Sequence, residues 1–176
     1  CFFTGSQGSG DDNIEASDFT LDPAKEYKIE FMMWGAKDEV DNYTALIDKF
    51  MDENENVTVS ITTQDSTQYM STLTGRLSGT MPDLFYLPEY EFRPWVDSGR
   101  LLSISNGFTE EEYSSLWSTA VDWYSYNRAK KTLGVSEGSD LYCLPKDIGP
   151  WTLMYNVDMV EEMVRNGKLT QGEADL

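Results

Sequence analysis

The chain has 176 residues, of which 40% are hydrophobic, 13% aromatic and 25% charged, and its formal net charge is −18. This length is enough for one domain with a hydrophobic core, and a charge of this size repels phosphate backbones and anionic membrane surfaces, which argues against nucleic-acid binding. The sequence has no histidine, which excludes Ser-His-Asp and Cys-His catalysis and removes the commonest metal ligand. Its two cysteines are too few for a thiolate metal site, so we expect neither a metal nor a cofactor.

The N-terminal segment, residues 1–26, is rich in Gly, Ser, Asp and Asn and has little apolar surface, which predicts a flexible tether. The first residue is Cys1. A cysteine followed by a polar tether is what removal of the signal peptide leaves on a bacterial lipoprotein, where the thiol carries the lipid. We therefore expect Cys1 to be lipidated and to anchor the protein to the membrane; the alternative is that the sequence was simply cut at that point.

The first half of the body alternates predicted strands and helices. Tyr27–Trp34 is apolar on both faces, which is typical of a buried parallel strand. An apolar stripe predicts a helix over 39–53, and Val57–Thr63 is a second strand. A helix over 67–78 and a third strand, Asp83–Leu87, follow. This βαβαβ order predicts a parallel sheet with right-handed crossovers.

The second half begins with a short helix and contains a capping box, Thr109-x-x-Glu112, that predicts an amphipathic helix as far as Tyr124. A loop is predicted over 127–139. Two short apolar runs then indicate two more strands, and a last helix is followed by a polar tail, residues 167–176, that should fray. In chain order these strands and this helix are Leu141–Leu144, Trp151–Tyr155 and Val157–Asn166.

The loop between the last two predicted strands contains two prolines, one glycine, Asp147 and, at its far end, Trp151. A fixed carboxylate accepts hydrogen bonds from hydroxyl groups, and an indole packs against the apolar C–H face of a sugar. The loop therefore suits a polyhydroxylated ligand. Alternatively, it is a tight turn between two core strands with a buried tryptophan.

Ligands of open parallel sheets bind outside the carboxyl ends of the strands. The predicted loops at that edge carry carboxylates, an amide, an ammonium group and large rings, and none has a Gly-rich phosphate-binding pattern. Exposed acids on loops are usually only solvated, so the argument depends on several loops converging. The candidate ligand-binding residues are Trp34, Lys37, Asp38, Glu39, Gln64, Glu89, Tyr90, Asp147 and Trp151.

Two motifs occur in a fixed order and separation, Pro82-Asp83-Leu84-Phe85 and Leu153-Met154-Tyr155-Asn156-Val157-Asp158. With the strand ending Trp34-Gly35, they make the chain resemble the N-terminal lobe of extracellular solute-binding proteins of ABC sugar importers, the maltose-binding-protein-like family 1. The resemblance spans about 27–166. It implies an α/β fold of the periplasmic-binding-protein type, with an open, mostly parallel sheet flanked by helices.

The resemblance also implies a function. Such proteins have two lobes that close on a sugar and deliver it to membrane permease subunits. By position, it implies that the loops after the first and third strands, together with Asp147 and Trp151, line the sugar site. In this family a Cys1-plus-tether arrangement is a lipid anchor, which would place the protein on the extracellular face of the bacterial membrane or in the periplasm.

The chain departs from the family in length. Members are about twice as long, so the resemblance implies that the second lobe is largely missing and that this is an N-terminal portion. The expected function is the capture of an extracellular carbohydrate, which we expect to be an oligosaccharide, without catalysis. One alternative is a glycoside-active enzyme that uses a carboxylate pair, Asp38 or Glu39 with Asp147. Another is a surface lipoprotein with no role in transport.

Overall fold

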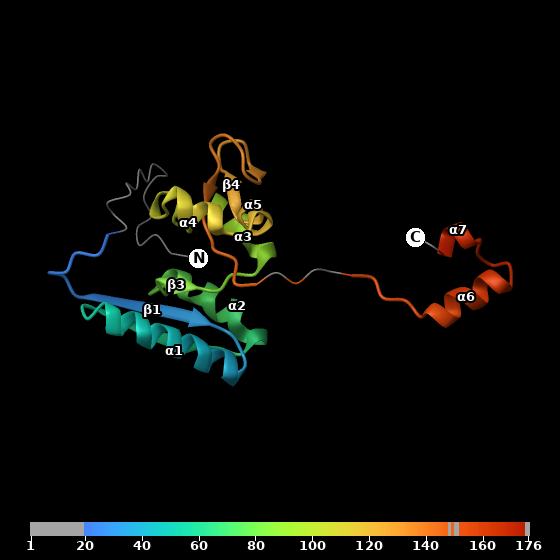
Figure 1. The fold of residues 1–176 in the computed structure, drawn as a ribbon. Coiled ribbons are helices and arrows are strands. Elements are labelled where there is room, and N and C mark those ends of the chain that lie inside the picture. The colour runs from blue at the N-terminus through green and yellow to red at the C-terminus, as the bar shows by residue number, and fades with distance from the viewer. Residues whose placement is uncertain (1–19, 148, 150–151, 175–176) are drawn as a thin grey trace. The chain divides into compact units, whose positions relative to one another are not determined.

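The computed structural model describes residues 20–147, 149 and 152–174 (Figure 1). These divide into two compact units, with the division between Lys146 and Asp147. The tether's first 19 residues, with Cys1, and Trp151 lie outside the described residues. The sequence-based extent of the lobe, 27–166, stays a prediction. No helix in the described part of the chain is long and apolar enough to cross a membrane.

The first unit contains the expected parallel sheet, in the strand order β2-β1-β3. β1 is Tyr27–Met33 and pairs along its whole length with β2, Val57–Thr63. β3 is shorter than predicted, Leu84–Phe85, and pairs with Phe31 and Met32. The end of β1 is buried on both faces, as the apolar pattern predicts. The predicted α/β class with a parallel sheet flanked by helices is confirmed.

Helices cover both faces of this sheet. α1, Lys37–Glu53, begins two residues earlier than predicted, and its Tyr43 ring lies 5.7 Å from the Phe31 ring. α2, Ser66–Gly75, continues into the 3-10 helix η2, Arg76–Ser78, and packs on Met32. Adjacent strand residues point to opposite faces, so α1 and α2 flank opposite sides of β1 (Figure 1).

A second, antiparallel sheet lies in the same unit, with the order β5-β4-β6. Its central strand β4 pairs with both neighbours, and the bounds are Ser125–Asn127 for β4, Thr132–Leu133 for β5 and Asp140–Leu141 for β6. The sequence predicts a loop over 127–139, and this is wrong for β5. The pairing segments are only two or three residues long, which is too short for a periodic signal.

The helix predicted from the capping box as far as Tyr124 is two helices, α4, Glu110–Ser115, and α5, Ser118–Trp123. The capping box itself is present. Between the helices, Leu116 and Trp117 are extended, with ψ of 147° and 115°. Leu116 thereby packs with the buried cluster of Ile104, Val121 and Leu141. The apolar residues keep a helix-like spacing across this break, so the sequence pattern does not reveal that the helix ends at Ser115.

The main core lies between the parallel sheet, α2, α3 (Glu89–Asp97) and β4. Phe92 of α3 packs edge-on against three tyrosine rings, at centroid distances of 5.5 to 6.4 Å, from Tyr124, Tyr126 and Tyr142. Cys143 is buried beside them. This core holds together the elements whose loops form the site described below.

The second unit contains α6, Val157–Arg165, as predicted, and α7, Gln171–Ala174, where the sequence predicts a polar tail. The strand predicted over Trp151–Tyr155 is wrong for its described part. Residues 152–155 form no regular structure, and the Leu153 and Met154 side chains are 91% and 90% exposed. An apolar run forms a strand only where another strand pairs with it, and no described strand pairs here.

Candidate ligand-binding site

The carboxyl ends of the parallel strands lie at one edge of the sheet and are held by backbone contacts. Just after β2, the Gln64 N–H donates to the Met33 carbonyl at 3.1 Å. Just after β3, the Tyr86 N–H donates to the Met32 carbonyl at 3.1 Å. The loops after β1, β2 and β3 therefore leave the sheet side by side, which is the arrangement that brings ligand-binding side chains together in such sheets.

Trp34 is the first residue after β1 and is fixed by two aromatic contacts. Its ring meets the Tyr69 ring edge-to-face at 4.6 Å and the Tyr86 ring at 5.1 Å between centroids. The Tyr69 hydroxyl in turn donates to the carbonyls of Met32 and Tyr86, each at 2.9 Å. Burial raises the pKa of Tyr69, so its hydroxyl remains a donor at neutral pH. The half-buried Trp34 ring thus has a defined orientation.

Glu39 is the half-buried carboxylate of this edge. Its Oε1 lies 2.5 Å from Lys146 Nζ and accepts a hydrogen bond from the Tyr86 hydroxyl at 3.3 Å. Lys146 Nζ also lies 5.2 Å from the centre of the Tyr86 ring, within cation–π range. Burial, then Tyr43 and the Glu39 charge, raise the pKa of Tyr86, which keeps its hydroxyl protonated. We call Trp34, Glu39, Tyr86 and Lys146 the rim cluster.

Gly35 makes this arrangement possible. A Cβ placed on Gly35 would lie 2.7 Å from Glu39 Oε2, closer than real Cβ contacts allow. The carboxylate therefore lies against the backbone of the β1–α1 loop, between Gly35, Lys146 and Tyr86. Because α1 begins at Lys37, Glu39 also belongs to its acidic first turn, where the helix dipole favours a negative charge.

Besides Gln64, which follows β2, four predicted residues of the first unit lie on loops of the same edge but outside the rim cluster. Lys37 is exposed and its Nζ lies 2.5 Å from the Asp41 carboxylate. Asp38 is exposed in the first turn of α1. Glu89 and Tyr90 start α3 after β3, and the Tyr90 side chain is 75% exposed. These four side chains are available to a ligand, and their role in binding one stays a prediction.

The place of Asp147 and Trp151 relative to this edge stays a prediction. Asp147 is exposed and belongs to the second unit, and Trp151 lies outside the described residues. Sequence reasoning missed Tyr86 and Lys146. The available signals were that Tyr86 ends a strand and that Lys146 is a cation beside Asp147. Neither signal shows which acid would pair with the lysine.

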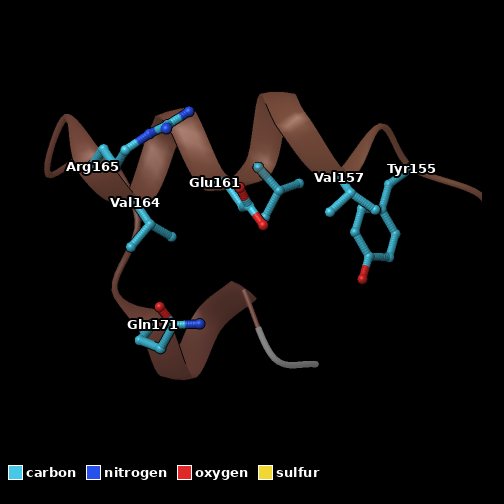
Figure 2. Close-up of a pocket in the computed structure, with 7 residues that line it drawn as sticks. Tyr155, Val157, Glu161, Val164, Arg165 and Gln171 are labelled. Atoms are coloured by element: carbon cyan, nitrogen blue, oxygen red, sulfur yellow. The ribbon is translucent and has the colours of Figure 1, made fainter.

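Two pockets lie elsewhere, and no predicted site residue lines either of them. One, of about 360 Å³, is formed within the second unit by α6, α7 and Tyr155, with Val164 pointing toward Gln171 and Val157 lying beside Tyr155 (Figure 2). The other, of about 540 Å³, lies beside α4 and α5 of the first unit. Within the described ranges, no group of three or more Cys, Asp or Glu side chains is arranged to hold a metal ion.

Comparisons with solved structures identify the same fold at low sequence identity. An ABC substrate-binding protein from Listeria monocytogenes, in complex with cycloalternan, matches with a TM-score of 0.52 and 19% identity, covering 59% of this chain and 27% of that chain. UspC of M. tuberculosis matches with a TM-score of 0.51 and 20% identity, covering 65% of this chain and 25% of that one. The GacH receptor of Streptomyces glaucescens, solved unliganded and with acarbose, gives 0.51 and 16%, covering 57% and 26%.

The chain therefore spans about a quarter of the length of each of these proteins. No curated protein matches the sequence. The family comparison covers more of the chain, because residues 45–171 match the model of the bacterial extracellular solute-binding proteins. This match includes most of both units, and the chain belongs to the bacterial extracellular solute-binding protein family.

Proposed function

We propose that this chain supplies one wall of the carbohydrate site of a solute-binding protein that serves an ABC importer. The rim cluster carries the proposal. It presents an oriented indole, a fixed carboxylate and an ammonium group at the carboxyl edge of a parallel sheet, where such folds bind ligands. The ring offers an apolar face to a sugar, and the polar groups offer hydrogen bonds to its hydroxyls.

Two of the structural relatives support the ligand class. The Listeria protein was solved with cycloalternan and the Streptomyces receptor with acarbose. In this chain we propose that Lys37, Asp38, Gln64, Glu89 and Tyr90 extend the wall around the rim cluster. Asp147 and Trp151 are further proposed ligand-binding residues. Permease subunits are the proposed partner, and a lipid on Cys1 is the proposed attachment to the extracellular face of the membrane.

Binding without catalysis fits the state of the rim carboxylate. A glycosidase needs two carboxyl groups placed on either side of the scissile bond. Glu39 is instead held by Lys146 and Tyr86, and the proposed partner Asp147 belongs to the second unit. We propose that the protein captures its sugar unchanged. Incubation with oligosaccharides should therefore release no new reducing ends, and their appearance would favour the enzyme.

Calorimetry against a panel of oligosaccharides tests the proposal. Because a sugar held by one wall makes only part of its contacts, we expect this chain to bind no more tightly than about millimolar, or about −4 kcal/mol. Trp34→Ala should abolish the heat of binding, and Leu46→Ala, which removes an exposed side chain of α1, should not. Micromolar affinity would show that the wall is more complete than proposed, and unchanged binding by Trp34→Ala would place the sugar elsewhere.

Glu39→Gln separates the role of the carboxylate from general effects of charge. Its matched control is Glu53→Gln, at the end of the same helix, where the exposed carboxylate lies 3.9 Å from Lys49. We expect Glu39→Gln to weaken binding several-fold and Glu53→Gln to leave it unchanged. Equal effects of the two would mean that only the overall charge matters.

A further inference from the structure

One pocket of the first unit lies outside the rim cluster and combines apolar and polar lining residues. It has a volume of about 540 Å³ and is formed by α4, α5 and the residue that follows the β5 turn. We call it the α4–α5 pocket. Its main lining residues are Tyr113, Leu116, Ser118, Thr119, Asp122 and Val135.

The carboxylate of this pocket is held from one side only. Asp122 Oδ1 accepts a hydrogen bond from the Val135 N–H at 2.8 Å. Gly134 approaches the same atom closely: its φ is +97°, and a Cβ there would lie 3.0 Å from Asp122 Oδ1. The turn after β5 therefore fixes the orientation of the carboxylate. The contacts described for this residue leave Oδ2 able to accept a hydrogen bond from a ligand.

The remaining lining combines an apolar base with hydroxyl groups. Val121 is buried and Leu116 is half-buried, and both belong to the smaller core cluster. Ser118 and Thr119 are exposed at the start of α5, and Ser118 stands one helical turn before Asp122 on the same side of the helix. A ligand that fits this pocket has an apolar surface and several groups that donate and accept hydrogen bonds.

Charge narrows the class of ligand. No cationic side chain lines the α4–α5 pocket, and its only charged group is Asp122. The first turn of α4 adds the carboxylates of Glu110, Glu111 and Glu112, and the whole chain carries −18. The negative field of these carboxylates opposes the binding of an anion such as a phosphate or a carboxylate. The pocket volume lies in the range of small-molecule sites.

From these observations we propose that the α4–α5 pocket binds a neutral sugar, independently of the rim cluster. The C–H face of a pyranose ring packs on Leu116 and Tyr113, and its hydroxyls bond to Asp122 Oδ2 and to the hydroxyls of α5. A sugar combines an apolar face with a polar rim, which matches this lining better than a purely apolar ligand does. An open pocket of this kind gives an affinity of about millimolar.

Backbone amide chemical shifts of the full chain, recorded during a maltose titration, test the proposal. We expect saturable shifts at 113–122 and at Val135. Asp122→Asn should weaken them about tenfold, because an amide keeps the Val135 contact but loses a charged acceptor. Thr119→Trp should abolish them by filling the pocket. Glu111→Gln, on α4 but outside the lining, is the matched control and should bind as the parent does.

The outcomes separate this site from the rim cluster. Trp34→Ala should leave the shifts at the α4–α5 pocket unchanged. Sugar binding at the rim cluster and sugar binding at the α4–α5 pocket can therefore each be refuted without refuting the other. The absence of saturable shifts there, or shifts that persist in Thr119→Trp, would overturn the proposal. Saturable shifts with ethylammonium chloride but not with maltose would also overturn it, because they would assign the pocket to a cation.

Discussion

The two units each contain an amphipathic helix of nine residues, α3 and α6, and the two helices differ in how much of the apolar face is buried. α3 and α6 are both amphipathic. α3 buries Phe92, Trp95 and Val96 in the main core, whereas α6 buries no side chain at all. The periodic spacing predicts the helix and its apolar face in both cases. Whether that face is covered depends on the elements around the helix. For α6, the packing partner among the described elements is α7.

The difference in burial between α3 and α6 should affect how much each helix contributes to the free energy of unfolding. A helix of this length is marginal by itself in water, so most of its stability comes from packing its apolar face. In the first unit the packing is supplied by β4, by Tyr142 and Cys143 after β6, and by the parallel sheet. In the second unit Val157 and Met159 are 56% and 63% exposed. The comparison therefore predicts that substitutions of equal size have unequal effects in the two units.

The largest expected effect is that of Phe92→Ala in α3. The ring is 2% exposed and contacts three tyrosine rings, so its removal leaves a cavity in the main core. We expect a loss of about 3–5 kcal/mol in the free energy of unfolding, measured in urea. Met159→Ala in α6 is the counterpart and should change it by less than about 0.5 kcal/mol. Similar losses in both variants would show that α6 is packed as tightly as α3.

The next effect concerns a half-buried ion pair of the first unit. Arg76 binds Glu30 through two hydrogen bonds, of 2.7 and 2.6 Å, and Thr62 adds a third at 2.8 Å. The Arg76 hydrogen bonds hold the pKa of Glu30 below its ordinary value. A lowered pKa in the folded state stabilises the protein above the unfolded pKa, and this contribution is lost as the pH falls through the folded value.

Glu30→Gln should therefore lower the free energy of unfolding by about 1–2 kcal/mol at neutral pH, and the difference from the parent should shrink below about pH 4. Urea unfolding at a series of pH values measures this. Glu161→Gln in α6, where the side chain is exposed, is the control. A difference between Glu30→Gln and the parent that stays constant with pH would mean that the glutamate acts by packing alone.

Much of the fold of the first unit could be predicted because its signals are long. β1 and β2 have seven residues each and α1 has seventeen, which is enough for a period to appear. The break at Leu116 could not be predicted, because an extended pair of residues leaves the apolar spacing of the flanking helices intact. The strand β5 could not be predicted because two residues are too few to show a period.

The site was predictable to a smaller extent. The rule that ligands bind beyond the carboxyl ends of parallel strands located Trp34 and Glu39 correctly at that edge. It did not predict that Lys146 would pair with Glu39, because these residues are more than a hundred positions apart and only the fold brings them together. The α4–α5 pocket was also missed, since its Asp122 is fixed by a turn that no motif indicates.

A glycine in each unit gives a smaller and more specific test. Gly35→Ala places a Cβ 2.7 Å from Glu39 Oε2, so the carboxylate must move and its contact with Lys146 is lost. We expect a stability loss of about 1 kcal/mol, because a flexible side chain can shift, together with a change in the chemical shift of Lys146 Nζ. Gly172→Ala in α7 meets no atom within 4 Å and should be neutral or slightly stabilising. An undisturbed Lys146 signal in Gly35→Ala would show that the glycine is not needed for the rim cluster.

The smallest effect on the whole protein is expected at the start of α6. The Asn156 side chain caps this helix by accepting the Met159 N–H at 3.1 Å. Asn156→Ala should weaken the local helix by about 1 kcal/mol and so speed the hydrogen exchange of amides 160–165. The cap belongs to the second unit and the main core to the first, so we expect the exchange of Phe85 and the urea midpoint to stay unchanged. If instead both units lost protection together, the two would unfold as one cooperative body, and the contrast between α3 and α6 would concern exposure alone rather than stability.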